Sequence, residues 1–360
     1  MKFNTKELSV KLNALKSIAN VKFGQDLQGV LLKNNLLIAN NLKTEMIVPI
    51  SKEEDSFECI VPPVAIDFIS SLHSDSVELV EEDNQLTVVC GSVNCKFATR
   101  KGQDYPETDT SLPDEKNLVF RIDKDVFQEA VKQVLFACAK QNASKPAMEG
   151  VLFEGENDCL NIVACDGFRV AWKKISMPSI KSFKAVLNKE VLQKLLSLAE
   201  GDLSFYIDGI TSIVITVGDY QIRSKLFIAS QFIDFRAVFP TEYIAAFSVK
   251  RDLLLDCFNR LSICIANKKT TPAIFEQGKS DLINISSADQ QVKLNETIPV
   301  DSDAFEKSVK IGMNVEFMKE ALKASSQDNL IIKVSDSRKP LIISDSSLNQ
   351  IIMPVRLKGI

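Results

Sequence analysis

Apolar residues recur at helical spacing in several parts of the chain. In the segment 188–199, for example, Val191 and Leu195 fall on one face of a helix. Asn188 and Asn314 begin two such segments and are suitable N-caps, because an Asn side chain accepts a hydrogen bond from the first helical turn. The segments predicted to be helical are 6–19, 63–72, 123–145, 188–199, 250–269 and 314–325.

Short runs of alternating polar and apolar residues follow these helical segments. Residues 203–226 contain three such runs, separated by Asp208-Gly209 and Gly218-Asp219, which are pairs that favour tight hairpin turns. Similar runs occur at 77–80, 86–90, 330–334 and 341–344. The sequence therefore predicts a mixed fold of the α+β class.

A common order of elements occurs three times along the chain. Phe3, Phe120 and Phe247 each begin a unit in which a helix and strands follow. A strand pattern recurs in step around Ala39, Ala164 and Ser287. Chance similarity among amphipathic elements is the alternative interpretation. The predicted domains have a typical size and span residues 1–117, 118–245 and 246–360.

Composition and charge narrow the class of protein. Hydrophobic residues make up 45% of the chain and charged residues 25%, as in an ordinary globular protein. No stretch approaches the ~18 consecutive apolar residues of a membrane helix, and residues 1–7 do not resemble a signal peptide. A cytoplasmic protein is expected. The net charge of −4 argues against general electrostatic coating of nucleic acid, but it is compatible with a local basic surface.

The residues needed for most enzyme chemistry are scarce. His73 is the single histidine and lies in a polar segment, so we expect it at the surface and not as a catalytic base. The eight cysteines include no CxxC pair, which favours reduced thiols over a metal site. Asp166, Asp234 and Asp289 do not form the acidic cluster that a two-metal site needs. We therefore expect no catalytic activity, no metal and no cofactor.

Positive charge is concentrated on the predicted helices. The six helical segments carry a net charge of +6, which leaves −10 for the rest of the chain. If the helices face a polyanion, their basic residues would contact phosphates without reading sequence. The alternative is that lysine is simply a good helix former. The basic residues that would face such a polyanion are Lys11, Lys16, Lys132, Lys140, Lys194, Arg260, Lys268, Lys269 and Lys323.

Several segments, in order along the chain, resemble one protein family. The two most specific segments are Glu149 to Glu154, with the sequence EGVLFE, and Ile162 to Ala171, with the sequence IVACDGFRVA. They resemble the patterns GxLFE and VATDGHRLA of the bacterial DNA polymerase III beta subunit, the DNA sliding clamp. The other resembling segments are KFAT through DYP at 96–106, SKL through FIDFRAVFP at 224–240, and IIMPVRL at 351–357.

The resemblance implies an architecture and a function. Three DNA-clamp domains per chain would place helices around the hole of a ring and antiparallel sheets outside. Two chains would associate head-to-tail into a homodimer around duplex DNA. The implied protein is a processivity factor without chemistry of its own, which tethers the polymerase III alpha subunit, the clamp loader and other clamp-motif proteins. The alternatives are a divergent paralogue that binds such partners without being loaded on DNA and, more remotely, an unrelated enzyme of repeated α+β domains.

The resemblance also implies two interaction sites. The first is a hydrophobic cleft for partner peptides between the second and third domains. Its residues would be Met148, Cys165, Gly167, Phe168, Arg169, Val170, Ile233, Val238, Pro340, Ile351, Ile352, Met353, Pro354, Val355 and Arg356. The second is a ring interface with Phe97 and Thr99 on one edge, opposite Ile263 and Cys264.

The chain departs from the family pattern at several of these positions. Phe168 replaces the usual His after Asp-Gly, and Ile233 and Ala237 replace a Pro and an Arg. Lys358-Gly359-Ile360 extend beyond the usual terminal Leu. These departures leave the preferred partner motif open.

Overall fold

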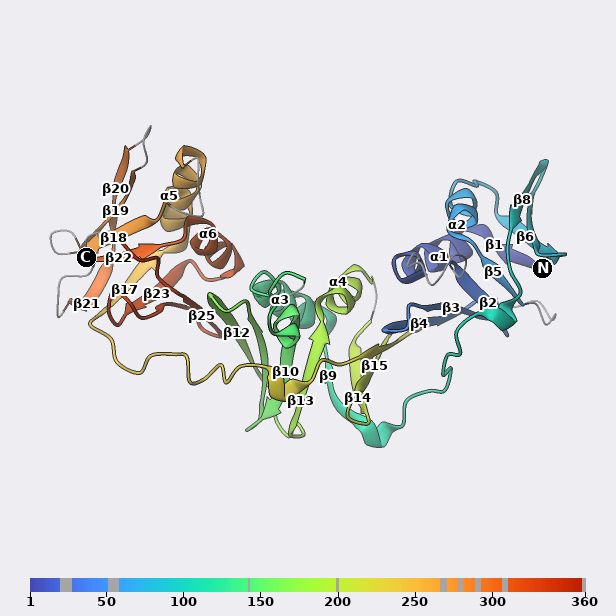
Figure 1. Cartoon of the computed structure of the whole chain (residues 1–360), viewed down its shortest axis with the longest axis horizontal. Coiled ribbons are helices and arrows are strands. Elements are labelled where there is room, and N and C mark those ends of the chain that lie inside the picture. Colours follow the sequence, from blue (N-terminus) through green and yellow to red (C-terminus); the bar gives the residue numbers. More distant parts are fainter. Residues whose placement is uncertain are drawn as a thin grey trace. The chain divides into compact units, whose positions relative to one another are not determined.

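The computed structural model describes most of the chain (Figure 1). The described residues are 1–19, 28–50, 58–141, 143–198, 201–265, 271–277, 281–288, 293–305 and 310–357. They form two compact units. The first unit comprises Met1–Lys124 and Glu190–Leu226, and the second comprises Asp125–Lys189 and Phe227–Ile360.

The first unit contains two antiparallel sheets. The larger has the strand order β5 (Glu58–Val61), β2 (Val30–Lys33), β3 (Leu36–Asn40), β4 (Thr44–Pro49), β16 (Tyr220–Lys225), β15 (Ser212–Val217), β14 (Leu203–Asp208) and β9 (Leu118–Ile122). The smaller has the order β1 (Lys2–Asn4), β6 (Ser76–Glu82), β7 (Gln85–Cys90) and β8 (Val93–Ala98). The helices of this unit are α1 (Thr5–Ala19), α2 (Pro63–Ser70) and, apart from its first residue, α4 (Lys189–Ser197).

The second unit repeats this design. Its larger antiparallel sheet has the order β13 (Phe183–Asn188), β10 (Gly150–Glu156), β11 (Cys159–Cys165), β12 (Arg169–Ser176), β25 (Leu348–Ile352), β24 (Leu341–Ser344), β23 (Asn329–Val334), β17 (Ala245–Lys250) and β21 (Asp301–Phe305). The smaller has the order β20 (Lys293–Pro299), β19 (Leu282–Ala288), β18 (Ala273–Gln277) and β22 (Lys310–Met313). The helices are α3 (Lys124–Leu135), α5 (Arg251–Cys264) and α6 (Val315–Ala324).

Helix faces and caps explain why these elements form. In α1, Leu8, Leu12 and Leu15 are fully buried at helical spacing. The helix packs on β3, β4 and α2 (Figure 1). The N-cap of α6 is as predicted, because Oδ1 of Asn314 accepts a hydrogen bond of 3.0 Å from the backbone N–H of Phe317. The α+β class and antiparallel sheets predicted from the sequence are confirmed.

Helices α3 and α5 end several residues before the sequence predicts, and the other helices differ from the prediction by one or two residues at their ends. Helix α3 ends at Leu135, and the predicted extension to residue 145 is wrong: a turn follows, and a short 3₁₀ helix begins at Pro146. Lys140 therefore lies outside α3. Helix α5 ends at Cys264, whereas helix was predicted to residue 269. Lys268 and Lys269 lie outside the described residues, as do Asp289 and the 358–360 tail.

Two further expectations concern residue chemistry. All eight cysteines are free thiols, and five of them are buried. His73 is exposed, as expected. Among the described helices, none is long and apolar enough to cross a membrane.

Each larger sheet joins strands that are far apart in the sequence. In the first unit β4 pairs with β16, so that Thr44 faces Ser224. In the second unit β12 pairs with β25, so that Arg169 faces Ile352. The pairing of β12 with β25 brings predicted cleft residues of the two strands together.

Candidate partner-binding site around Arg169

A tight turn between β11 and β12 positions the centre of the site. Oδ1 of Asp166 accepts hydrogen bonds from the backbone N–H groups of Phe168 (2.9 Å) and Arg169 (3.0 Å). Sγ of Cys165 accepts one from the N–H of Gly167 at 3.2 Å. Gly167 has φ of +88°, a left-handed conformation that glycine adopts without strain. The turn leaves Phe168 outward, 62% exposed, and places Arg169 at the start of β12.

The side chain of Arg169 is held by three separate segments. Its Nε donates to Oδ2 of Asp166 at 3.0 Å, and its Nη1 donates to Oε2 of Glu320 on α6. Nη2 donates to the backbone carbonyl of Phe136, just after α3, at 2.8 Å. The guanidinium also lies 4.3 Å from the ring centre of Phe317 and 5.0 Å from that of Phe136. Arg169, only 8% exposed, thus ties β12 to α6 and to the end of α3.

Five of the expected cleft residues belong to one apolar cluster beside this arginine. They are Met148, Cys165, Val170, Ile233 and Ile351. Aromatic residues complete the cluster, and Trp172 meets Phe235 edge-on at 4.9 Å and Phe239 at 5.5 Å between ring centres. Burial in this cluster raises the pKa of the Cys165 thiol to about 11, which keeps it protonated near neutral pH.

Ile352 does not join these residues. It is 1% exposed and packs in the other core cluster of the unit, with Leu341 and Ile343. Successive residues of a strand point to opposite faces, which separates Ile352 from Ile351. The expected placement of Ile352 on the cleft surface is therefore replaced by a core position.

The outer rim of the site is partly exposed and apolar. The N–H of Met353 donates to the carbonyl of Phe168 at 2.8 Å, so the C-terminal segment runs beside the turn. Met353 and Val238 are each 39% exposed. The ring centre of Phe168 lies 6.4 Å from that of Phe317. Pro340 is half-buried, in the loop before β24.

Met353 also begins one wall of a neighbouring hollow of about 490 Å³. Pro354, Val355 and Arg356 continue that wall, and Lys310, Ser337 and Arg338 line the hollow as well. Exposed apolar side chains next to a hollow offer anchor points for a peptide.

A charge cluster lies at the edge of the apolar cluster. Glu154 is buried, and its carboxylate accepts from Lys184 at 2.8 Å and from Arg236 at 2.5 Å. Burial alone would raise the pKa of Glu154, but the hydrogen bonds and charges of the two cations outweigh it and hold the pKa below its usual range. The guanidinium of Arg236 lies 4.4 Å from the Phe235 ring centre, so the cluster supports the aromatic residues.

The expected DNA-facing residues differ in their surroundings. Lys132, Lys140 and Lys323 are exposed, whereas Lys194 is half-buried. The other three described members are paired with carboxylates: Lys11 with Glu7, Lys16 with Asp67, and Arg260 with Glu296.

The expected ring-interface residues lie on two separate surfaces. Phe97 is half-buried against Phe68 at 5.4 Å between ring centres, and Thr99 donates to the carbonyl of Ile60. Ile263 is 84% exposed on α5, so it is not a core residue, and Cys264 beside it is half-buried.

Three residues that hold Arg169 were missed by the sequence analysis. Phe317 and Glu320 are three positions apart on α6 and therefore share a helix face, which is the one signal the sequence offers. Phe136 contributes a backbone carbonyl and a ring from just after α3. Their meeting with Arg169 depends on long-range packing, which spacing along the chain does not report.

Comparison with known proteins places the chain in a family. The model of the DNA polymerase III beta subunit central domain matches residues 121–233, and that of its C-terminal domain matches residues 236–356. A beta sliding clamp of Mycoplasmopsis pulmonis is 23% identical over 296 residues, covering 79% of this chain and 77% of that protein. The beta sliding clamp of Escherichia coli is 26% identical over 284 residues, covering 77% and 75%.

A solved structure shares the fold along the whole length. The crystal structure of a putative DNA polymerase III beta subunit from Eubacterium rectale superimposes with a TM-score of 0.89 at 20% identity, covering 98% of each chain. The two domain matches together span most of the chain, and sequence and fold agree with them. The chain belongs to the DNA polymerase III beta subunit family.

Proposed function

We propose that this protein is a DNA sliding clamp, a processivity factor that holds a polymerase on duplex DNA. The observation that carries the proposal is membership of the beta subunit family, joined with a helix-and-sheet design that occurs three times in the order of elements. Relatives that share 23–26% of their residues with it are named beta sliding clamps. A processivity factor catalyses no reaction itself, so the isolated chain should incorporate no nucleotides.

The clamp would be a head-to-tail homodimer of three domains per chain, at residues 1–117, 118–245 and 246–360. Ile263 is 84% exposed on α5, so its apolar side chain is available for contact with a second chain. Phe97 and Thr99 would lie on the opposite edge. Solution mass measured over a concentration series should show a species near twice 40.0 kDa. Ile263→Asp should shift it to the monomer, and Ile210→Asp, at an exposed turn, is the control.

DNA would contact basic residues on the helices through its phosphates. Such contacts are independent of sequence and weaken with salt. Lys132→Glu with Lys323→Glu, both at exposed positions, should reduce retention on circular DNA and polymerase stimulation. The matched control is Lys116→Glu, an exposed lysine outside the six helices. Unchanged retention in the double variant would contradict this assignment.

Partner proteins would insert a short peptide into the cleft beside Arg169. Candidate partners are the polymerase III alpha subunit, the clamp loader and other proteins with a clamp-binding motif. The proposed contact set is the expected one without Ile352, whose side chain lies in the core. Phe168→Ala with Met353→Ala should weaken binding of a clamp-motif peptide by about tenfold, because two exposed anchors are lost. Ile210→Ala, at a still more exposed apolar residue elsewhere, is the control.

A divergent paralogue that binds clamp partners without being loaded on DNA is the second candidate. Phe168, Ile233 and Ala237 favour it, because they depart from the family pattern at the partner site. Loading by the cognate clamp loader onto nicked circular DNA separates the two. Peptide binding without loading would support the paralogue, and loading with polymerase stimulation would exclude it.

A further inference from the structure

The turn that presents Arg169 has a close counterpart in the first unit. Between β3 and β4, Oδ1 of Asn41 accepts from the N–H groups of Lys43 (3.1 Å) and Thr44 (2.7 Å), as Asp166 does for Phe168 and Arg169. Thr44 begins β4 as Arg169 begins β12. Thr44 is therefore the counterpart of Arg169.

Two further hydrogen bonds extend this correspondence. Oδ1 of Asn40 accepts from the N–H of Leu42 at 2.7 Å, in the role that Sγ of Cys165 has for Gly167. The N–H of Asn41 donates to the carbonyl of Thr44, as that of Asp166 does to the carbonyl of Arg169. The two turns therefore share one backbone geometry.

The helices beside the two turns also correspond. Helix α4 begins directly after Asn188, and α6 begins directly after Asn314. Counting from these residues, Lys194 of α4 corresponds to Glu320 of α6, and Val191 corresponds to Phe317. The carboxylate that binds Arg169 is thus replaced by an ammonium group in the first unit.

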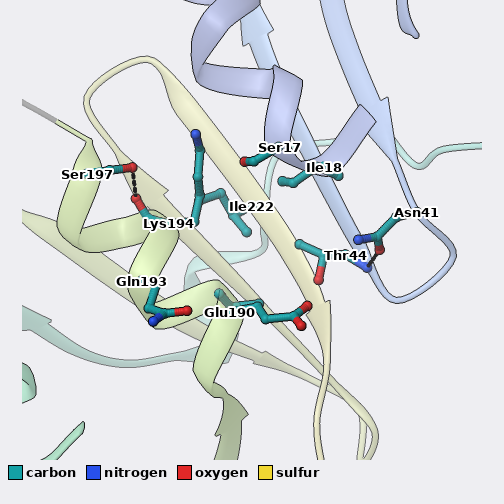
Figure 2. A pocket seen from close by; sticks show the side chains of 10 residues that line it. Ser17, Ile18, Asn41, Thr44, Glu190, Gln193, Lys194, Ser197 and Ile222 are labelled. Carbon is teal, nitrogen blue, oxygen red and sulfur yellow. Dashed lines mark hydrogen bonds between the residues drawn. The ribbon is translucent and has the colours of Figure 1, made fainter. Parts of the chain in front are cut away.

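The space that an arginine side chain fills in the second unit is open in the first. A pocket of about 430 Å³ lies between the last turn of α1, the 41–44 turn and α4 (Figure 2). Its lining includes Ser17, Asn41, Thr44, Val191, Lys194 and Ile222. These residues present hydroxyl, amide and ammonium donors on an apolar base. All three charged members of the Arg169 group, namely Arg169, Asp166 and Glu320, have changed, to Thr44, Asn41 and Lys194.

The ammonium of Lys194 lacks a counter-ion within this pocket. It is half-buried, and burial lowers its pKa because the charged form is less well solvated there. Among the residues that the structure describes, none forms an ion pair or hydrogen bond with its Nζ. Glu190 also lines the pocket, but its carboxylate and the Lys194 ammonium point to opposite ends (Figure 2).

An adjoining hollow shares Lys194 with the pocket. It has a volume of about 760 Å³ and is also lined by Lys6, Glu7 and Lys11 of α1 and by Asp219. Lys11 is paired with Glu7 at 2.8 Å, so this acid is already engaged. A half-buried cation is favoured when an anion binds beside it.

We propose that the pocket between α1, the 41–44 turn and α4 is an oxyanion site that takes a phosphate group. Lys194 supplies the positive charge, and the hydroxyls of Ser17 and Thr44 supply donors to phosphate oxygens. The bound group restores the ion pairing that Arg169 and Glu320 provide in the second unit. The phosphate comes either from free inorganic phosphate or from the backbone of encircled DNA, and this second source rests on the proposed function.

The first experiment uses the full chain and inorganic phosphate at constant ionic strength. NMR of the lysine side chains should show a saturable change at Lys194 and a rise in its pKa, because a bound anion favours the charged form. Calorimetry should show about tenfold weaker binding for Lys194→Gln and retained binding for Lys194→Arg. Lys116→Gln, at an exposed lysine outside the α-helices and the pocket, is the matched control and should bind as the parent does.

The second experiment identifies the source with a short duplex DNA. A response of Lys194 to duplex but not to phosphate assigns the site to the DNA backbone, whereas a response to phosphate stands even if the protein is never loaded on DNA. If Lys194 responds to neither, or if Lys116→Gln lowers binding as much as Lys194→Gln does, the proposal is overturned.

Discussion

The turns at 40–44 and 165–169 have the same hydrogen-bonded backbone conformation, but their side chains make different contacts. In both, an Asn or Asp accepts two backbone hydrogen bonds and sets the direction of the next strand. In the second unit Arg169 then fills the space beside α6, whereas in the first unit Thr44 leaves a pocket beside α4. Local hydrogen bonding therefore sets the backbone conformation of the turn. The first side chain of the following strand decides whether the space beside the helix is filled or left as a pocket.

The largest expected effect comes from removing the Arg169 side chain, which fills the space beside α6. Arg169→Ala should lower the free energy of unfolding by about 3 kcal/mol, because it removes a buried cation from Asp166 and Glu320. The exposed side of Glu320 regains water, which keeps the loss at the lower end of the range for buried pairs. Urea unfolding measures it. Arg121→Ala, in an exposed pair with Glu115, should lose under about 1 kcal/mol, and equal losses would refute the comparison.

The next effect comes from placing an arginine at position 44, where its side chain would fill the pocket beside α4. Thr44→Arg should fit the pocket but destabilise the chain by about 2 kcal/mol, because the new guanidinium meets Lys194. Adding Lys194→Glu restores the sign of the Arg169–Glu320 pair and should recover about 1 kcal/mol. A double-mutant cycle by thermal unfolding measures this coupling. Lys132→Glu, on a helix of the other unit, should show no coupling to Thr44→Arg.

Two carboxylates, the buried Glu154 of the second unit and the half-buried Glu45 of the first, should respond oppositely to pH. The pKa of Glu154 is lowered, so its stabilisation is present above its unfolded value near 4.5 and is lost as pH falls through the folded pKa. Glu154→Gln should therefore lose about 1.5 kcal/mol near neutral pH, and the difference should vanish in acid. Unfolding by urea at several pH values measures both effects.

Glu45, beside Thr44, is the matched comparison for that titration. Burial raises its pKa against the opposing charge of Arg223, so its contribution is greatest below 4.5 and is lost as pH rises through the raised value. Glu45→Gln should then be at least as stable as the parent near neutral pH. A loss equal to that of Glu154→Gln would contradict the assigned environments.

The smallest effect concerns the left-handed residue of each turn. Leu42 has φ of +61° where Gly167 has +88°. Leu42→Gly should raise the free energy of unfolding by about 0.5 kcal/mol, because relief of backbone strain slightly exceeds the entropy that glycine loses. Gly167→Ala should lower it, although a Cβ there meets nothing within 4 Å. Thermal unfolding of the two variants should therefore move in opposite directions.

Local signals predicted much of the fold. Helical spacing and the Asn314 cap located α6, and the Gly218-Asp219 pair located the β15–β16 hairpin. The ends of α3 and α5 were misplaced, because apolar residues such as Phe136 and Ile265 continue the pattern past each helix end. At the candidate site, a motif such as Asp166-Gly167 was recognisable from the sequence. The burial of Ile351 and Ile352 in different clusters could be assigned only once the orientation of their strand was known.

The sequence by itself determined the family, the α+β class and the turn that ends in Arg169, because these depend on residues close together in the chain. The tertiary structure alone decided which distant residues meet that turn. Glu320 and Phe136 contact Arg169 from segments far along the chain, and Lys194 faces the pocket beside Thr44. The physical reason is that charge pairing and burial depend on distance in space, and long-range strand pairing, such as β4 with β16 and β12 with β25, sets those distances.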